Sequence, residues 1–447
     1  MIRDMTQGSP SKIMILFTVP MILGNLFQQL YNIVDSVVVG NYVGPDALAA
    51  VGASSSITFL FIAIATGSSI GCSVVISQFF GAKRLVQMKT AVYTALTSVV
   101  LLSLIMTVIG LLMSGSILRW MSTPDDIMVN ADIYLRIYLM GLCFMFLYNI
   151  CTAAFNALGD SRTPLCFLIF SSITNIILDL LFVLRFHAGV AGVAWATLIS
   201  QGIASLLALL VLLLRLHKIH AEEPSRLFDG AMLIHIGKVA IPSIIQQSIV
   251  SVGVVFVQAL VNRYGTNVVA GYTAATKIDS IAIVPMINIG NAVSAFTAQN
   301  IGAKQPERVK KGLRAALLMV FVIGGMLTAS LYLFGGSFVG LFVDTETNRE
   351  VIAVGIEYLR VVGTFYVLMG SMASFNGVLR GSGDMRMFMF CTLANFFCRV
   401  ASAYALSALI GEAAIWWSIP LGWLIGLLLA GGRFLSGSWK SKSAIGD

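Results

Sequence analysis

The sequence has little charge for its length. Asp, Glu, Lys and Arg make up 11% of its 447 residues, whereas hydrophobic residues make up 58%. A soluble globular chain carries about 25% charged residues, so this composition argues against a soluble protein. A helix needs about 20 apolar residues to cross a bilayer, and apolar runs of that kind recur along the whole chain. The composition therefore predicts an all-α integral membrane protein.

The sequence also lacks the patterns that mark enzymes and metal centres. Its six cysteines are scattered through apolar segments without a C-x-x-C pair, and its four histidines have no H-E-x-x-H spacing. A G-x-S-x-G motif is absent as well. The net charge of +8 follows membrane sidedness and does not indicate nucleic-acid binding. We therefore expect no enzyme, no cofactor, no disulfide framework and no nucleic-acid partner.

Twelve apolar segments are predicted to cross the membrane. They fall at residues 13–40, 48–80, 90–117, 131–155, 164–185, 189–215, 235–262, 267–298, 313–342, 351–377, 386–410 and 413–435. The longest polar linker, residues 218–226, separates the sixth segment from the seventh. We therefore predict an N-terminal six-helix lobe at 1–215, a cytoplasmic linker at 216–234 and a C-terminal six-helix lobe at 235–447.

The two halves of the chain repeat each other. The matching pairs, in order along the chain, are Pro20 and Pro242, Gln78-Phe79-Phe80-Gly81-Ala82-Lys83 and Gln299-Asn300-Ile301-Gly302-Ala303-Lys304, and Gly159-Asp160 and Gly383-Asp384. Because each half has an even number of spans, both halves enter the membrane from the same side, so the repeats are parallel. Internal duplication of an apolar chain is typical of a secondary transporter, whose site lies in a central cavity between the repeats.

The basic residues predict the orientation of the chain. Lys and Arg are concentrated in the cytoplasmic loops of membrane proteins. With the N-terminus inside, most basic residues fall in inner segments, and the outer ends hold Arg119, Arg136, Arg185, Arg263, Arg349 and Arg360. We therefore expect both termini in the cytoplasm and a multi-pass protein of the cytoplasmic membrane.

Three aspartates lie well inside predicted spans: Asp35, Asp179 and Asp279. A carboxylate at the bilayer centre costs about 2.5–3.5 kcal/mol on insertion scales, and such residues usually mark ion paths. Asp35 and Asp179 each belong to a polar stripe with helical spacing. The stripes are Asn25, Gln28, Gln29, Asn32, Asp35 and Ser36 on the first span, and Ser171, Ser172, Asn175 and Asp179 on the fifth. Such a stripe must face protein or a water-filled cavity.

The residues themselves leave two choices open. The amides either join helices together or line a transport path. A buried carboxyl pair favours proton uptake, whereas the same carboxyls with Asn175 and hydroxyl groups form an oxygen cage suited to sodium. For Asp279, a structural ion pair with Lys277 or Arg399 through another helix is the better expectation. Pro20 and Pro242 each kink a span, either as a static bend or as a hinge.

The sequence resembles the multidrug and toxic compound extrusion (MATE) transporters over essentially its whole length. The resemblance rests on Pro20, Gln28-Gln29, Asp35 and Gly40 in the first span, Ala47-Leu48-Ala49-Ala50-Val51-Gly52, Gln78-x-x-Gly81-Ala82 with its copy Gln299-x-x-Gly302-Ala303, Gly159-Asp160-Ser161-Arg162-Thr163-Pro164, and Arg380-Gly381-Ser382-Gly383-Asp384. Singly these motifs are weak. Their order on a duplicated twelve-span chain makes the resemblance specific.

The resemblance implies a multidrug efflux antiporter that exports small organic cations in exchange for protons or sodium by alternating access, acting as a monomer in the bilayer. It places the cation site in the N-terminal lobe. The implied coupling residues, which would also hold sodium, are Asp35, Asn175, Asp179 and Thr197. The expected cavity residues are Gln28, Gln29, Asn32, Tyr134, Asn149, Asn156, Gln246 and Gln247, and the expected hinges are Pro20 and Pro242.

The chain departs from the other bacterial branch, which has acidic residues in its seventh and tenth spans. Here the seventh span has Gln246 and Gln247, which argues against a sodium site in the C-terminal lobe and leaves Asp279 unassigned. The main alternative function is a lipid-linked precursor flippase of the same wider superfamily. Such chains often have a strongly cationic cavity, whereas only Lys277 and Arg399 are basic within spans here.

Overall fold

The chain folds into long helices that are apolar enough to cross a membrane. The computed structural model describes residues 3–221, 223–341 and 349–446, and these contain no strand. Within them, ten spans are continuous and two are bent helix pairs, which gives up to twelve spans. The predicted all-α membrane fold is therefore confirmed. The parts of these predictions that fall on residues 1–2, 222, 342–348 and 447 lie outside the described residues.

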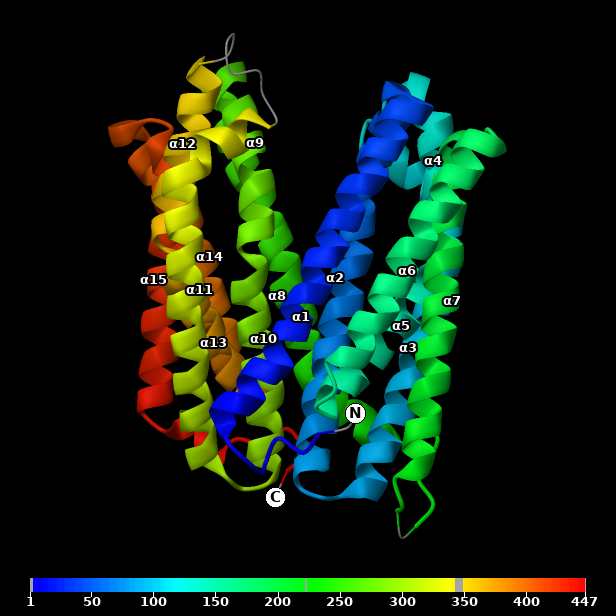
Figure 1. Ribbon diagram of the computed structural model, residues 1–447, viewed down its shortest axis with the longest axis vertical. Coiled ribbons are helices and arrows are strands. Elements are labelled where there is room, and N and C mark those ends of the chain that lie inside the picture. Colours follow the sequence, from blue (N-terminus) through cyan, green and yellow to red (C-terminus); the bar gives the residue numbers. More distant parts are fainter. Residues whose placement is uncertain (1–2, 222, 342–348, 447) are drawn as a thin grey trace. The chain divides into compact units, whose positions relative to one another are not determined.

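The helices of the first half of the sequence run from α1 to α7, and those of the second half from α8 to α15 (Figure 1). The first set is α1 Pro10–Val38, α2 Pro45–Gly81, α3 Leu85–Trp120, α4 Asp125–Met140, α5 Leu142–Ala157, α6 Arg162–Leu180 and α7 Gly189–Lys218. The second set is α8 Gly230–Val261, α9 Thr266–Ala282, α10 Val284–Gly302, α11 Pro306–Gly340, α12 Arg349–Thr364, α13 Tyr366–Ser382, α14 Met385–Ile410 and α15 Ala413–Leu435. Short helices follow α1 at Val39–Val43, α6 at Leu181–Arg185, α8 at Asn262–Tyr264 and α15 at Ser438–Ser441.

The fourth and tenth predicted spans are bent rather than straight. The helices α4 and α5 meet at Gly141 with a bend of 46°, and α12 and α13 meet at Phe365 with a bend of 47°. Glycine is a common site of helix kinks, which accounts for the first bend. The bend at Phe365 has no such residue at the break. The hydropathy of these segments indicates one span each and carries no information about the bends.

The described chain forms two compact units. The first unit consists of Met1–Arg3 and Leu23–Ile244, and the second consists of Asp4–Ile22 and Ile245–Asp447. The boundaries fall inside α1 and α8, shortly after Pro20 and Pro242. The first part of α1 therefore packs with the second unit, and the first part of α8 packs with the first unit.

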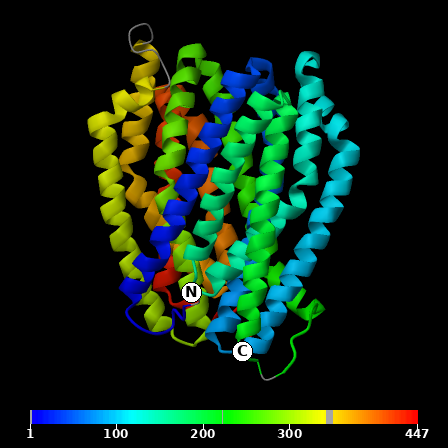
Figure 2. The same ribbon diagram turned by 45° about the vertical axis from the view of Figure 1, so that its right-hand side comes forward.

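In the first unit, α8 begins in close contact with α2 and α3. A Cβ atom on Gly67 or Gly71 of α2 would come within 2.6 Å of backbone atoms of Ile244 or Ala240 on α8. Only glycine permits this approach. The backbone N–H of Asp229, just before α8, donates to the Thr94 hydroxyl of α3 at 3.1 Å. In the same unit, α3 and α4 lie side by side (Figure 2).

In the second unit, the segment before α1 is bound by the second copy of the repeated motif. The Met5 N–H donates to the Gln299 side chain at 2.8 Å. The Arg308 guanidinium donates to the carbonyl oxygens of Met5 and Gly8 at 3.2 and 3.0 Å. The repeated Gln299 therefore has a structural role, because it holds the chain as it enters the first helix.

The repeated Gly-Asp pairs form matching turns. Gly159 and Gly383 have φ values of 76° and 90°, a left-handed region that favours glycine. Asp160 forms an ion pair with Arg215 of α7, and Asp384 forms one with Arg433 of α15 at 2.7 Å. Each turn thus connects the helix before it to the last long helix of its half.

Candidate functional site

The four residues expected to couple transport to a cation come together in the first unit. Asn175 and Asp179 are four residues apart on α6, so they lie on the same helix face. Both are 1% exposed. The Asn175 amide, oriented to satisfy its neighbours, donates to Asp179 Oδ2 at 2.8 Å and accepts from the Thr197 hydroxyl at 3.2 Å. The packing of α6 against α7 places Thr197 at this position.

Asp35 completes the site from α1. Its carboxyl group is within hydrogen-bonding reach of the Asp179 carboxyl. Among the described residues, one oxygen of each carboxyl, Oδ1, is buried without a hydrogen-bond partner. Two carboxyl groups this close share a proton unless a cation binds between them and allows both to be ionised. The arrangement therefore favours binding of a small positive ion.

Two tyrosines, Tyr31 and Tyr134, lie near the carboxyl pair, and a third, Tyr138, packs against Tyr134. Tyr31 is one helical turn before Asp35 on α1 and interacts with the Thr197 hydroxyl. Tyr134 and Tyr138 on α4 stack with their ring centroids 6.4 Å apart, and Tyr134 lies near both carboxyls. Tyr134 also packs against a cluster of buried residues, Val38, Val39, Ala47, Val183, Val190 and Val193. This packing places an apolar wall behind Tyr134.

Two of these tyrosines were missed by the sequence analysis. Tyr134 was expected in the cavity, whereas Tyr31 and Tyr138 were not identified. Each was open to detection by helical spacing, because Tyr31 is four residues from Asp35 and Tyr138 is four from Tyr134. The polar stripes were defined by amide, carboxyl and hydroxyl residues such as Asn, Asp and Ser, and tyrosine was not among them.

The groups at the site that can bind a cation are oxygen atoms and phenol rings. Two carboxyls, an amide oxygen and a hydroxyl suit a proton or a hard cation such as sodium, because hard cations prefer oxygen ligands. Aromatic faces attract organic cations through their negative π-systems. The site can thus accept either kind of positive charge.

The remaining expected cavity residues lie elsewhere in the fold. Gln28 and Asn32 are exposed on α1, and Asn32 Nδ2 is 3.5 Å from Gln29 Oε1. On α5, the Asn149 amide donates to the Met145 carbonyl at 2.9 Å, while Asn156 Oδ1 is buried without a partner among the described residues. The remaining two, Gln246 and Gln247, are partly exposed on α8 in the second unit.

Asp279 in the second unit has different partners from those expected. The hydroxyls of Tyr366 and Tyr358 donate to its two carboxyl oxygens at 2.7 and 3.2 Å. Arg399 acts on Asp279 through its charge, but its Nε has no hydrogen-bond partner in the part of the chain that the structure describes. The expectation of an ion pair is therefore replaced by a hydrogen-bonded carboxyl group.

Comparisons with known proteins agree with this architecture. The family profile described as MatE matches residues 20–181 and, a second time, residues 242–405. The chain is 31% identical to the probable multidrug resistance protein YpnP of Bacillus subtilis, with 98% of each chain covered. It is 32% identical to the probable multidrug resistance protein YoeA of the same organism, over 96% of this chain and 94% of the relative.

Solved structures give the same result for the fold. A crystal structure of MATE in the straight conformation matches with a TM-score of 0.90 at 25% identity, covering 98% of this chain and 99% of the other. A crystal structure of MATE in the bent conformation has a TM-score of 0.89 at 24% identity and covers 98% and 97%. The two family matches fall on the two halves of the repeat. The chain is therefore a multi-pass membrane protein that belongs to the MATE family of transporters and is not an enzyme.

Proposed function

We propose that the chain is a multidrug efflux antiporter, which exports organic cations in exchange for protons or sodium by alternating access. The observation that carries this proposal is the site formed by Asp35, Asp179, Asn175 and Thr197. The names of the curated relatives, which describe probable multidrug resistance proteins, support a role in drug export. Small organic cations are the species that a buried anionic site with aromatic walls binds best.

The mechanism depends on competition for the carboxyl pair. When Asp35 and Asp179 are ionised, their charge attracts a lipophilic cation toward the aromatic side chains of Tyr31 and Tyr134. When a proton or sodium ion neutralises the pair, that attraction is lost and the organic cation leaves. One pH unit across the membrane supplies about 1.36 kcal/mol per proton, enough for roughly a tenfold concentration ratio.

The prolines supply the hinges in this mechanism. Pro20 and Pro242 lie inside α1 and α8, where a missing backbone N–H weakens the helix locally. Both helices pass from one compact unit to the other just beyond these residues. Bending at these positions would open the site to alternate sides without unfolding either unit.

The orientation and location also belong to the proposal. Both termini are placed in the cytoplasm, and the protein acts as a monomer in the cytoplasmic membrane. The support is the concentration of Lys and Arg in the inner segments, including Lys83, Arg84, Lys310 and Lys311.

Transport in proteoliposomes tests the proposal. Vesicles loaded with a fluorescent organic cation receive a proton gradient in one series and a sodium gradient in another. We expect one gradient to drive dye movement in the wild type, and Asp35→Asn and Asp179→Asn each to abolish it. Asp46→Asn, an exposed aspartate in the first turn of α2, is the matched control and should transport normally.

Two results would contradict the proposal. Undiminished flux in both site variants would reduce the aspartates to structural residues. Absence of dye movement under either gradient in the wild type would favour the alternative, a lipid-linked precursor flippase.

A further inference from the structure

A second acidic group in this molecule has no role in the site described above. Asp279 is on α9 in the second unit, and α9 packs chiefly against α12. Within a membrane span, an ionisable residue is expensive and is by default a candidate for function. Asp279 is only partly exposed, so it is largely shielded and still accessible to a proton.

The carboxyl group of Asp279 joins two helices across a bend. Tyr358, on α12, donates to Oδ2, and Tyr366, on α13, donates to Oδ1. These two helices meet at Phe365, where the span bends by 47°. One carboxylate is therefore hydrogen-bonded to the helices on both sides of the bend.

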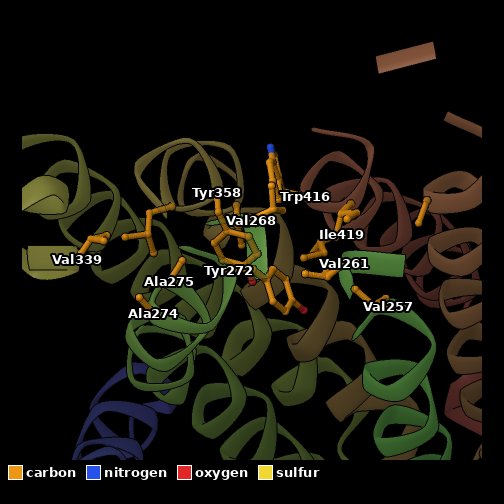
Figure 3. Close-up of a cluster of buried hydrophobic side chains, with 14 of the residues drawn as sticks. Val257, Val261, Val268, Tyr272, Ala274, Ala275, Val339, Tyr358, Trp416 and Ile419 are labelled. Carbon is orange, nitrogen blue, oxygen red and sulfur yellow. The ribbon is translucent and has the colours of Figure 1, made fainter. Parts of the chain in front are cut away.

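The surroundings of the two tyrosines are apolar. Tyr358 is 2% exposed and Tyr366 is fully buried, and both belong to a cluster with Tyr272, Trp416 and Ile419. Figure 3 shows the rings of Tyr272 and Tyr358 beside Trp416. Ring centroids are 5.5 Å apart for Tyr272 and Tyr358 and 6.2 Å apart for Tyr358 and Trp416. This packing fixes the tyrosine hydroxyls, so the carboxyl must adapt to them.

The charged neighbours are few. Arg399 on α14 acts on Asp279 through its charge, and its Nε has no hydrogen-bond partner within the described part of the chain. Lys277 is two residues from Asp279 on α9, a spacing that places the two side chains on different helix faces. Glu357 on α12 is exposed and accepts from the Trp416 indole at 3.2 Å. The remaining titratable groups that face Asp279 are the phenols of Tyr272, Tyr358 and Tyr366.

We propose that Asp279 is a second proton-binding group of the transporter, and that Tyr358 and Tyr366 transmit its protonation to the bend between α12 and α13. The ionised carboxylate accepts from both hydroxyls, and such charge-assisted bonds are about twice as strong as neutral ones. When a proton from solvent binds, the carboxyl oxygen that carries it becomes a donor. The neutral carboxyl group accepts less strongly from the two tyrosine hydroxyls, because the bonds are no longer charge-assisted, so the link across the bend weakens.

The first unit has a parallel arrangement. Tyr134 precedes the bend at Gly141 by the same number of residues as Tyr358 precedes the bend at Phe365. Tyr134 lies near Asp35 and Asp179, as Tyr358 lies near Asp279. Each unit therefore places a tyrosine of its bent span beside a carboxyl, although the carboxyls come from different helices. The proposal rests on the proposed antiport function for its physiological use, but proton binding itself can be measured without transport.

Infrared difference spectroscopy of the purified protein in lipid nanodiscs tests the proton site. Acidification should produce a carboxylic-acid carbonyl band in the Asp35→Asn/Asp179→Asn double variant, where the first site cannot respond. Adding Asp279→Asn should remove that band, whereas adding Glu357→Gln should leave it unchanged. Identical spectra with and without Asp279→Asn would overturn the proposal.

The design separates this proposal from the proposed function. A carboxylic-acid band that is present in the wild type and lost in the double variant reports on Asp35 and Asp179. If the wild type and the double variant have the same bands, Asp35 and Asp179 do not bind the proton, and the test of Asp279 is unaffected. If Asp279→Asn does not fold, Tyr366→Phe keeps the carboxyl and removes one of its donors. We expect that variant to shift the band, and an unshifted band would overturn the proposal.

A distance measurement tests the link to the bend. Spin labels at Ala353 on α12 and Ser371 on α13, in a chain freed of its native cysteines, report the angle between the helices. The distance distribution should change with pH in the parent and become independent of pH in Asp279→Asn. The same pH dependence in both would show that the bend does not respond to Asp279.

Discussion

At the scale of single residues, the candidate site depends on how a few oxygen atoms are shared. Asn175 can satisfy Asp179 and Thr197 together only when its amide has one orientation, so the three side chains act as a unit. Asp35 approaches the same carboxyl from another helix. Removing one partner leaves a buried polar group unsatisfied, which costs about 1–3 kcal/mol.

Thr197 offers a conservative test of this network. Thr197→Val keeps the shape of the side chain but removes the hydroxyl that meets the Asn175 amide. We expect about a tenfold weaker apparent affinity for the coupling ion, which corresponds to about 1.4 kcal/mol. Thr197→Ser retains the hydroxyl and should remain close to the wild type. Dye transport measured against proton or sodium concentration gives the affinity, and equal loss in both variants would point to packing rather than to the hydroxyl.

Asp160 gives a prediction about pH. Burial alone would raise the pKa of Asp160, but hydrogen bonds from Arg215 and Thr163 lower it from 3.8 to about 2. Because the pKa falls on folding, the contribution to stability is present above about pH 4 and is lost as the pH falls toward 2. Asp160→Asn should therefore lower the melting temperature at neutral pH by several degrees, and the difference should shrink between pH 4 and pH 2. A difference that stays constant over this range would contradict the assignment.

At the scale of secondary structure, close contacts between helices, rather than the hydrophobic effect, determine which helices pack together. Lipid is as apolar as the helix surfaces, so helices associate through small residues that allow close packing. Gly67 and Gly71 do this between α2 and α8, and Gly290 and Gly377 do it between α10 and α13. The α2 contact fixes the part of α8 that precedes its boundary between units.

A matched pair of glycine substitutions tests this packing. Gly71→Ala places a Cβ about 2.5 Å from Ala240, so backbone must move and folded protein should be lost. Gly115→Ala, on α3, meets no atom within 4 Å and should be neutral or stabilising, because alanine favours a helix by about 1 kcal/mol. The yield of monodisperse protein in size-exclusion chromatography, with thermal stability, measures both effects. Equal yields of the two variants would show that the backbones of α2 and α8 can move apart to accept the added Cβ atom.

At the scale of the whole molecule, the duplicated sequence gives two compact units that exchange the first parts of α1 and α8. Each exchanged segment is tied by specific bonds, such as Met5 to Gln299 and Asp229 to Thr94. The exchange gives the repeated Gln299 a structural role, because this residue binds the segment that precedes α1. It also explains why a hinge in α1 or α8 would be connected to both units.

The prolines in these two helices give a prediction at this scale. Pro20→Ala and Pro242→Ala restore a backbone donor and should stiffen α1 and α8. We expect dye binding at equilibrium to remain within about twofold of the wild type, while the transport rate falls several-fold. Flux and equilibrium binding measured on the same preparations distinguish the two effects. Normal flux in both variants would indicate that the prolines are static bends.

Sequence reasoning reaches some of these features and misses others for physical reasons. The spans follow from hydropathy, and the Asp35–Asp179 pairing follows from two polar stripes that cannot face lipid. The bends at Gly141 and Phe365 occupy single residues and do not alter the hydropathy. The partners of Asp279 come from α12 and α13, so no local pattern on α9 indicates that tyrosines would replace an ion pair. The exchange of helix segments between units depends on tertiary contacts alone.

In the proposed mechanism, one carboxyl pair binds either the coupling ion or the drug. Equilibrium binding of an organic-cation dye to purified protein in nanodiscs, at several pH values and with or without sodium, tests it most directly. In the wild type, protons or sodium should displace the dye. In Asp35→Asn/Asp179→Asn, residual dye binding should be independent of both ions. Displacement that is equally strong in the double variant would show that the competition occurs elsewhere in the protein and would contradict the proposed mechanism.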